Sequence, residues 1–304
     1  MNHFLEISQL SRNQVESLVT RARQFKNSST YPSFSEHRLA NLFYENSTRT
    51  RVSFELAAHH LSIPVVNLSE TSSSESKGEV IEDTVRTLAA MGITLFVIRH
   101  RQEGLQQSLV NQLSNSESIH IINAGDGTHA HPSQALLDLM TILENKPSLS
   151  RLKIAIVGNI RHSRVANSLQ SLFSLMGVGE LTLVAPDIWL PKTVHFGRAT
   201  DSLRDGISDA DVIICLRVQR ERLLDNEQID EQTYHQNYAL TTTTLRYAKE
   251  DALVMHPGPV NRGMEIDSPV ADGPQSVILR QVANGVFMRM AIIESLLTQS
   301  FGRL

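Results

Sequence analysis

Two arginines and three hydroxyl side chains stand together in the segment 45–51, which reads ENSTRTR. An amphipathic pattern over 52–61 follows it, so Ser47 is suited to cap the start of a helix. The first backbone amides of a helix have no partner inside it and attract anions. The segment therefore predicts a phosphate site that needs no glycine-rich loop. The alternative is a capped surface helix with solvated arginines.

Two further polar groups follow later apolar runs in the first half of the chain. RHR at 99–101 ends one run, and GDGTHAHPSQ at 125–134 follows the next. His131 precedes a proline, which biases its backbone toward an extended conformation. An imidazole there can donate a hydrogen bond to a carbonyl oxygen. A histidine that is satisfied within its own loop is the alternative.

The second half repeats this arrangement with arginine-rich segments. Its apolar runs are followed by GNIRHSR at 158–164, RVQRER at 217–222 and HPGPVNR at 256–262. Arginine recognises planar carboxylates through two parallel hydrogen bonds. Arg161 and Arg164 are spaced to share one helical face. The two prolines of HPGP predict a rigid turn that can include a cis peptide bond.

Common catalytic and cofactor signatures are missing from the sequence. It has no GxSxG, HExxH or Walker motif, and the segment after 157 lacks the full GxGxxG spacing of a dinucleotide site. No nucleophile or general base stands out. The residues therefore predict a site that joins a phosphorylated small molecule to a carboxylated one, with no metal and no cofactor.

The elements that must position these residues alternate between apolar, β-branched runs and helical patterns. We expect strands at 38–44, 65–69, 93–100, 119–124, 153–158, 181–186, 212–216 and 252–256. We expect helices at 9–25, 52–61, 80–91, 133–144, 165–176 and 281–297. This alternation predicts an α/β fold with two doubly wound parallel-sheet domains, in which ligands bind beyond the carboxyl ends of the strands.

Turn residues near 144–151 indicate the boundary between the two domains. We expect a first domain over 1–145 and a second over 146–279. The C-terminal helix, at about 280–304, is expected to return to the first domain.

Composition and charge limit the class of protein. Among 304 residues there is one cysteine, Cys215, which excludes an intramolecular disulfide and favours a reducing compartment, hence the cytoplasm. The N-terminus does not resemble a signal peptide, and no run approaches ~20 apolar residues, so we expect no membrane partner. The net charge of −4 argues against a nucleic-acid partner, although 22 of the 28 basic residues are arginine.

The quoted motifs resemble those of a known family along essentially the whole chain. FYENSTRTR at 43–51 and HPSQ at 131–134 resemble the two shared motifs of the carbamoyltransferases. RH at 99–100, NAGDG at 123–127, RVQ at 217–219 and HPGP at 256–259 resemble the aspartate-specific members. The resemblance implies transfer of the carbamoyl group from carbamoyl phosphate to the amine of L-aspartate. The products would be N-carbamoyl-L-aspartate and phosphate, in de novo pyrimidine biosynthesis.

The resemblance also implies roles for the residues that match family motifs. Those implied to bind the phosphate are Ser47, Thr48, Arg49 and Thr50. Those implied to polarise the carbamoyl carbonyl are Thr50, Arg99 and His131. Those implied to contact the carbamoyl amino group are Gln134 and the backbone of Gly258 and Pro259. Those implied to bind the two carboxylates of aspartate are Arg164, Arg217 and Gln219.

Quaternary structure follows from the same resemblance. Ser73 and Lys77 match a loop that completes the site of a neighbouring subunit, which implies a homotrimer with shared active sites and a catalytic role for Lys77. By composition alone, this stretch is a flexible surface loop. The resemblance also allows an additional partner chain, either regulatory or dihydroorotase-like.

The implied chemistry requires no protein base. The amine of aspartate attacks the carbamoyl carbon, Arg99, His131 and Thr50 stabilise the resulting oxyanion, and the leaving phosphate accepts the amine proton. Closure of the domains would exclude water, and we expect the polar loop at about 217–238 to move.

Three other functions are alternatives to this one. Ornithine carbamoyltransferase shares the phosphate half, but it needs an acidic or cysteine-bearing site where this chain has Arg164, Arg217 and HPGP. A catalytically silent scaffold subunit of a larger complex predicts loss of at least one of Arg49, Lys77, Arg99 or His131, all of which are present. A nicotinamide oxidoreductase is weakened by the missing glycine fingerprint.

Overall fold

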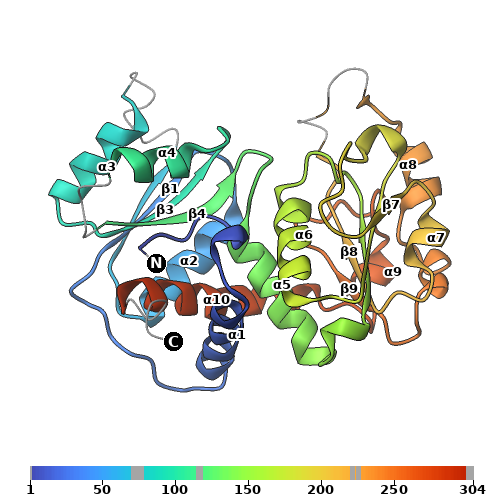
Figure 1. Ribbon diagram of the computed structural model, residues 1–304, viewed down its shortest axis with the longest axis horizontal. Coiled ribbons are helices and arrows are strands. Elements are labelled where there is room, and N and C mark those ends of the chain that lie inside the picture. Colours follow the sequence, from blue (N-terminus) through green and yellow to red (C-terminus); the bar gives the residue numbers. More distant parts are fainter. Residues whose placement is uncertain (1, 70–78, 114–118, 220–222, 224–226, 299–304) are drawn as a thin grey trace. The chain divides into compact units, whose positions relative to one another are not determined.

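The computed structural model describes residues 2–69, 79–113, 119–219, 223 and 227–298. The chain divides into two compact units (Figure 1). The first unit comprises Met1–Leu137 and Ala283–Leu304, and the second comprises Asp138–Val282.

The first unit is built on a parallel sheet of four strands in the order β2-β1-β3-β4. Its strands are β1 (Leu39–Phe43), β2 (Val65–Ser69), β3 (Leu95–His100) and β4 (His120–Asp126). Its helices are η1 (Ile7–Gln9), α1 (Arg12–Lys26), α2 (Thr48–His60), α3 (Ile81–Ala90) and α4 (Leu105–Gln112). Two longer helices, α5 (Pro132–Asn145) and α10 (Ile278–Leu297), continue across the boundary between the units.

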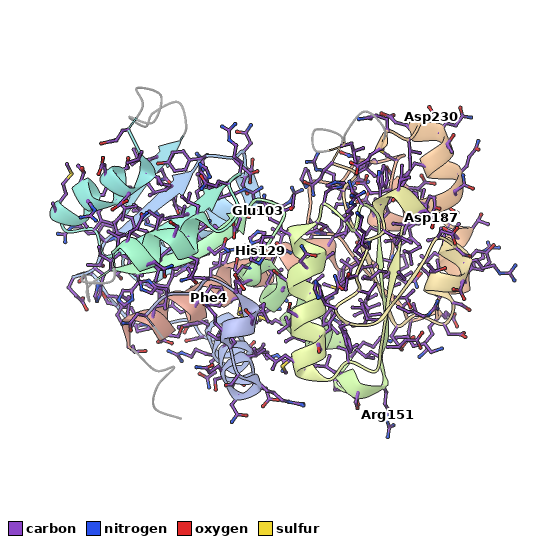
Figure 2. The ribbon with its side chains drawn as sticks, turned by 45° about the horizontal axis from the view of Figure 1, so that its top comes forward. Phe4, Glu103, His129, Arg151, Asp187 and Asp230 are labelled. Atoms are coloured by element: carbon purple, nitrogen blue, oxygen red, sulfur yellow. The ribbon has the colours of Figure 1, made fainter. Side chains whose placement is uncertain are left out.

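Apolar residues on both faces of this sheet explain why helices cover it on two sides. All five residues of β1 are buried, as a strand at the centre of a doubly covered sheet requires. One face packs against α3 and α4, through Val85 and Leu109 among others, while α2 and α10 lie across the other face (Figure 1). Phe4 lies beside β4, where its N–H donates to the Ile121 carbonyl at 2.8 Å (Figure 2).

The second unit has a parallel sheet of five strands in the order β7-β6-β5-β8-β9. Its strands are β5 (Lys153–Val157), β6 (Glu180–Val184), β7 (Arg198–Thr200), β8 (Val212–Cys215) and β9 (Leu253–Met255). Its helices are η4 (Leu149–Arg151), α6 (Arg164–Met176), η5 (Asp187–Trp189), α7 (Leu203–Ile207), α8 (Glu231–Tyr238), η8 (Thr244–Tyr247) and α9 (Ser268–Ala271). Within this unit α6 lies on one side of the sheet and α7 and α9 on the other (Figure 1).

The expected fold class, two doubly wound parallel-sheet domains, is confirmed, and each of the eight expected strands is present. The sequence did not predict β7, because this three-residue edge strand is largely exposed and has no apolar run. Helix α2 begins four residues before the expected helix, at Thr48, because its first turn carries polar side chains. Among the helices that the structure describes, none is long and apolar enough to cross a membrane.

Candidate active site

The start of α2 is the place where the sequence predicts an anion site in the first unit. Ser47 occupies the N-cap position with an extended backbone, as expected, but its hydroxyl makes no capping hydrogen bond. The first turn of α2 contains no acidic residue, so nothing within that turn offsets the positive end of the helix dipole. Thr48 and Arg49 are exposed, whereas Thr50 is 5% exposed. Amides, hydroxyls and a guanidinium are thus available to an anion at this point.

His131, in the same unit, lies beside the first turn of α2. It lies directly before α5, outside the helix as expected, and its carbonyl accepts from the N–H of Gln134 at 3.1 Å. Its Nε2 lies 3.5 Å from Oγ1 of Thr50, with both side chains buried. Gln134, in the first turn of α5, is 7% exposed. The structure therefore brings together two of the residues that the sequence assigned to the carbonyl oxygen.

Arg99 lies near the end of β3, opposite Phe43 of β1 in the sheet register. Its carbonyl accepts from the N–H of Tyr44 at 2.9 Å, so β1 and β3 stay paired up to the residues that follow β1. Its Nε lies 3.3 Å from Oε2 of Glu45, and this pair is largely buried. Glu45 is not among the site residues predicted from the sequence, although it belongs to the ENSTRTR segment. Its carboxylate places a negative charge beside the Arg99 guanidinium.

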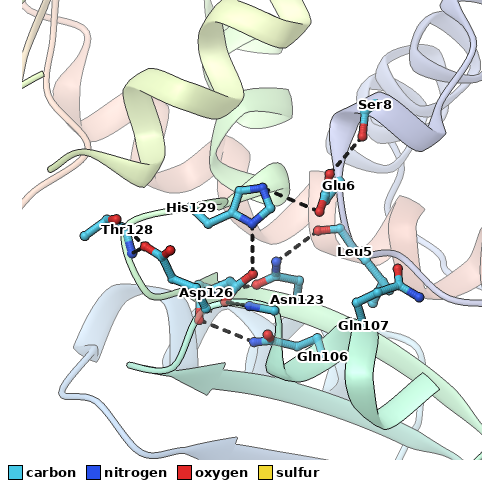
Figure 3. Close-up of polar contacts among 12 residues, drawn as sticks. Leu5, Glu6, Ser8, Gln106, Gln107, Asn123, Asp126, Thr128 and His129 are labelled. Atoms are coloured by element: carbon cyan, nitrogen blue, oxygen red, sulfur yellow. Dashed lines mark hydrogen bonds and ion pairs between the residues drawn. The ribbon is translucent and has the colours of Figure 1, made fainter. Parts of the chain in front are cut away.

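The loop that leads to His131 is fixed by the buried carboxylate of Asp126 (Figure 3). Its Oδ1 accepts from the N–H of Gly104 at 2.9 Å, and its Oδ2 lies 3.4 Å from Nδ1 of His129. Burial raises the pKa of Asp126. Gly127 has a φ of +48°, and a Cβ there would lie 3.0 Å from the Arg101 carbonyl, so glycine is required. Glu103 and His129, both labelled in Figure 2, lie in the two loops that the Asp126 carboxylate connects.

In the second unit, Arg164 is the first residue of α6 and is 5% exposed. Ser163 caps this helix, because its Oγ accepts from the N–H of Ala166 at 3.2 Å. The prediction that Arg161 shares a helical face with Arg164 is wrong, since Arg161 lies in the turn before α6. Its Nη1 lies 3.0 Å from Oε1 of Glu227, a partner that the sequence did not reveal.

Glu227 lies ten residues after Arg217 and is 3% exposed. Besides Arg161, its buried carboxylate lies 3.4 Å from Nε2 of His162, and its carbonyl accepts from the indole N–H of Trp189 at 3.0 Å. Part of the expected loop over 217–238 is helical, because Glu231–Tyr238 forms helix α8; movement of the segment stays a prediction. The reason for this helix is a local signal: Asp230 caps α8 by accepting from the N–H of Thr233 at 2.9 Å.

Arg217 and Gln219 follow β8 and are half-buried. The backbone before them is fixed by the Leu216 N–H, which donates to the Val157 carbonyl at 2.8 Å. Gly158 permits this approach, since a Cβ there would lie 2.7 Å from the Leu216 carbonyl oxygen. The two polar side chains thus leave the sheet at the same edge as Arg164.

The last predicted segment, HPGP, follows β9. Gly258 has a φ of +75°, and the peptide bond between Gly258 and Pro259 is cis, as the sequence allowed. Both residues are at least partly accessible, whereas His256 is 1% exposed. The turn therefore exposes backbone groups above a buried imidazole.

Two predicted site residues, Ser73 and Lys77, lie outside the described residues. The others lie at or after the carboxyl ends of strands, in the first unit at the end of β3 and after β1 and β4, and in the second unit after β5, β8 and β9. Among the described residues, no group of three or more His, Cys, Asp or Glu side chains could bind a metal ion. Each unit by itself thus presents polar groups at one edge of its sheet, where open α/β sheets bind ligands.

Comparison with known proteins assigns both parts of the chain. The family model for the carbamoyl-phosphate-binding domain of aspartate/ornithine carbamoyltransferases matches residues 2–144, and the model for the Asp/Orn-binding domain matches 150–296. The chain is 66% identical over 297 residues to the aspartate carbamoyltransferase catalytic subunit of Legionella pneumophila (strain Corby), covering 98% of this chain and 99% of the relative.

Two groups of solved structures have the same fold. The catalytic subunit of M. jannaschii aspartate transcarbamoylase is 31% identical with a TM-score of 0.85, and the match covers 100% of both chains. Aspartate transcarbamoylase from Trypanosoma cruzi, in complex with carbamoyl aspartate and phosphate, is 29% identical with a TM-score of 0.85, over 97% of this chain and 95% of that one.

Proposed function

This chain belongs to the aspartate/ornithine carbamoyltransferase family, and we propose that the polar residues of its two units act together in the family's reaction. It is an enzyme that transfers the carbamoyl group from carbamoyl phosphate to the amine of L-aspartate, giving N-carbamoyl-L-aspartate and phosphate. The observation that carries the site assignment is the contact between Thr50 and His131 beside the start of α2.

The phosphate of carbamoyl phosphate binds at the start of α2. Backbone amides, the hydroxyls of Ser47, Thr48 and Thr50, and the guanidinium of Arg49 supply donors there. These contacts neutralise the charge that the phosphate gains when its bond to the carbamoyl carbon breaks. The proposal assigns to Lys77 a further positive charge at a neighbouring subunit's site, together with a contact from Ser73.

The carbamoyl carbonyl points toward Thr50, Arg99 and His131. When the amine of aspartate attacks the carbon, negative charge develops on this oxygen, and each aligned donor lowers the barrier by about 3–4 kcal/mol. Glu45 keeps the Arg99 guanidinium in place for this task. Gln134 and the backbone of Gly258 and Pro259 orient the amino group.

Aspartate binds through Arg164, Arg217 and Gln219 of the second unit. Two guanidinium groups suit two carboxylates, whereas the side-chain amine of ornithine would be repelled by them. The carbon–nitrogen bond forms, the carbon–oxygen bond to phosphate breaks, and the departing phosphate accepts the proton from the amine. The proposal requires the two units to bring their halves of the site together during the reaction.

A product assay tests the proposed function. The pure protein is incubated with carbamoyl phosphate and either L-aspartate or L-ornithine, without added metal, and the products are identified by mass. We expect N-carbamoyl-L-aspartate and phosphate. Citrulline as the main product, or no carbamoylated product at all, would refute it.

We also propose that the enzyme is a homotrimer whose active sites are shared between subunits. Exposed apolar side chains support an interface near α2, since Val52 and Leu56 lie one turn apart on it and Val66 lies on the edge strand β2. Sedimentation of the pure protein tests this, and a mass other than three chains would argue against it.

The proposed setting is the cytoplasm, in de novo pyrimidine biosynthesis. The buried free thiol of Cys215, the only cysteine in the chain, is consistent with a reducing compartment. The relative's name as a catalytic subunit supports the proposal of a further partner chain. Co-purification from cells, followed by mass measurement of the complex, tests for such a chain.

A further inference from the structure

The turn after β9 is hydrogen-bonded to a buried pair of side chains, His256 and Glu265. Their side chains are 0% and 2% exposed, and Nε2 of His256 lies 3.1 Å from Oε1 of Glu265. Glu265 lies nine residues after His256, beyond the HPGP motif, and no sequence pattern indicated that the two side chains meet.

The hydrogen bonds of His256 determine its tautomer. Its Nδ1 accepts from the N–H of Gly258 at 2.8 Å, so the ring proton of the neutral imidazole lies on Nε2. That proton is donated to Glu265. One imidazole thus connects the amide of Gly258, in the middle of the turn, to a carboxylate beneath it.

The oxygen of Glu265 that faces His256, Oε1, also binds the far end of the turn. It accepts from the N–H of Asn261 at 2.6 Å, while the backbone carbonyl of Glu265 accepts from the N–H of Leu240 at 3.0 Å. The other oxygen, Oε2, is buried and has no hydrogen-bond partner among the described residues. Burying a carboxylate in this way is costly, so its two hydrogen bonds to the turn are its evident use.

A second connection starts from the backbone of His256. Its N–H donates to Oε1 of Gln281 at 3.0 Å, and Nε2 of Gln281 donates to Oδ1 of Asp138 at 2.6 Å. Asp138 belongs to α5, the helix whose first turn carries Gln134. The backbone of His256 is therefore linked through Gln281 to a buried carboxylate of α5.

We propose that His256 and Glu265 are positioning residues, which fix the backbone of the 256–259 turn so that it accepts hydrogen bonds from the carbamoyl amino group. Neither side chain touches substrate. The inference rests on the proposed function, because that function assigns the amino group to Gly258 and Pro259. It predicts that loss of the pair weakens binding of the carbamoyl moiety and leaves phosphate binding intact.

The test compares two ligands in two variants. Glu265→Ala removes the acceptor of both hydrogen bonds, whereas Glu265→Gln keeps an oxygen that accepts them. For Glu265→Ala we expect the KM for carbamoyl phosphate to rise about tenfold or more, with the inhibition constant of inorganic phosphate within about twofold of wild type. Glu265→Gln should stay within about threefold of wild type in both. Nitrogen NMR of labelled histidine should show the Nε2–H signal of His256 in wild type and in Glu265→Gln.

Asp211→Ala is the matched control. Asp211 is a buried carboxylate of the same unit that accepts from the N–H of Lys153 at 2.9 Å, at the start of β5 and β8. We expect this variant to lose thermal stability while the ratio of the two ligand constants stays unchanged. If Glu265→Ala does not fold, Glu265→Asp replaces it, because its shorter side chain cannot reach both donors and predicts the same separation.

Three results would overturn the inference. They are an unchanged KM in a folded Glu265→Ala variant, equal weakening of carbamoyl phosphate and inorganic phosphate, and the same selective loss in Asp211→Ala. A wild-type protein that transfers no carbamoyl group would instead overturn the proposed function. In that case the NMR signal of His256 still shows whether the pair exists.

Discussion

Oγ1 of Thr50 lies 3.5 Å from Nε2 of His131, although the two residues are 81 positions apart in the chain. Both side chains are buried, and each lies at the start of a helix, Thr50 in the first turn of α2 and His131 directly before α5. An oxygen that approaches one of them is within reach of the other. We propose that the oxyanion of the reaction forms beside this pair.

Thr50→Val tests that position. The variant keeps the shape of the side chain and loses the hydroxyl, so we expect kcat to fall about a hundredfold with a smaller change in the KM for carbamoyl phosphate. Ser53→Ala is the control, because the Ser53 hydroxyl donates to the helix carbonyl of Arg49 at 2.6 Å. A kcat for Thr50→Val within about threefold of wild type would remove Thr50 from the mechanism.

Glu45→Gln tests the residue that sequence analysis missed. Its carboxylate lies 3.3 Å from Nε of Arg99, so its neutralisation should loosen the guanidinium and lower kcat about tenfold. The double variant Glu45→Gln/Arg99→Ala should be no slower than Arg99→Ala alone, because the role proposed for Glu45 is to hold Arg99. Steady-state kinetics of the four proteins measure this coupling, and additive losses would show that Glu45 acts independently.

Arg217→Ala tests whether the second unit binds aspartate and the first binds carbamoyl phosphate. We expect the KM for aspartate to rise about tenfold or more, with the KM for carbamoyl phosphate nearly unchanged, because a charge-assisted hydrogen bond to a carboxylate is lost. Arg198→Ala provides a matched control on the exposed edge strand β7. Equal weakening of both substrates in Arg217→Ala would contradict the assignment.

Mixing two inactive variants tests for shared sites. Arg49→Ala removes the phosphate contact, and Lys77→Ala removes the residue proposed to reach into a neighbouring subunit. After subunit exchange, a trimer with both kinds of chain contains some sites with neither defect, so activity should reappear. Mixtures that exchange subunits, as shown by mass labelling, and stay inactive would exclude interfacial sites.

The stability of the first unit should depend on pH through its N-terminal segment. Burial lowers the pKa of His3 from 6.5 to about 4, and it also lowers the pKa of His120. Nδ1 of His3 accepts from the N–H of Ile121 at 3.2 Å, which a protonated imidazole cannot do. The stabilising effect of the neutral rings is therefore complete above pH 6.5 and is lost as the pH falls toward about 4.

Thermal unfolding measured between pH 7 and pH 4 checks this dependence. His3→Gln should have a flatter profile than wild type, since an amide can accept the same hydrogen bond and does not titrate in this range. Equal slopes for the two proteins would contradict the assignment to His3.

The segments that carry chemistry could be found from the sequence because their signals are local. Apolar runs and helical periodicity lie within a few residues, so eight strands and the α/β class followed from the order of the chain. Motifs such as ENSTRTR and HPGP are contiguous, and they indicated the family before any contact was known. The short edge strand β7 and the capped helix α8 were not predicted from the sequence, because neither carries an apolar pattern.

What only the tertiary structure decided is which charged and polar groups meet. Arg161 was expected beside Arg164 on a helix, but it pairs with Glu227, 66 residues away. Glu45 joins Arg99, and Glu265 joins His256, because sheet register and the turns after the strands bring their side chains together. Such pairs leave no periodic trace in the sequence, since burial and mutual distance, rather than spacing along the chain, determine where a buried charge finds its partner.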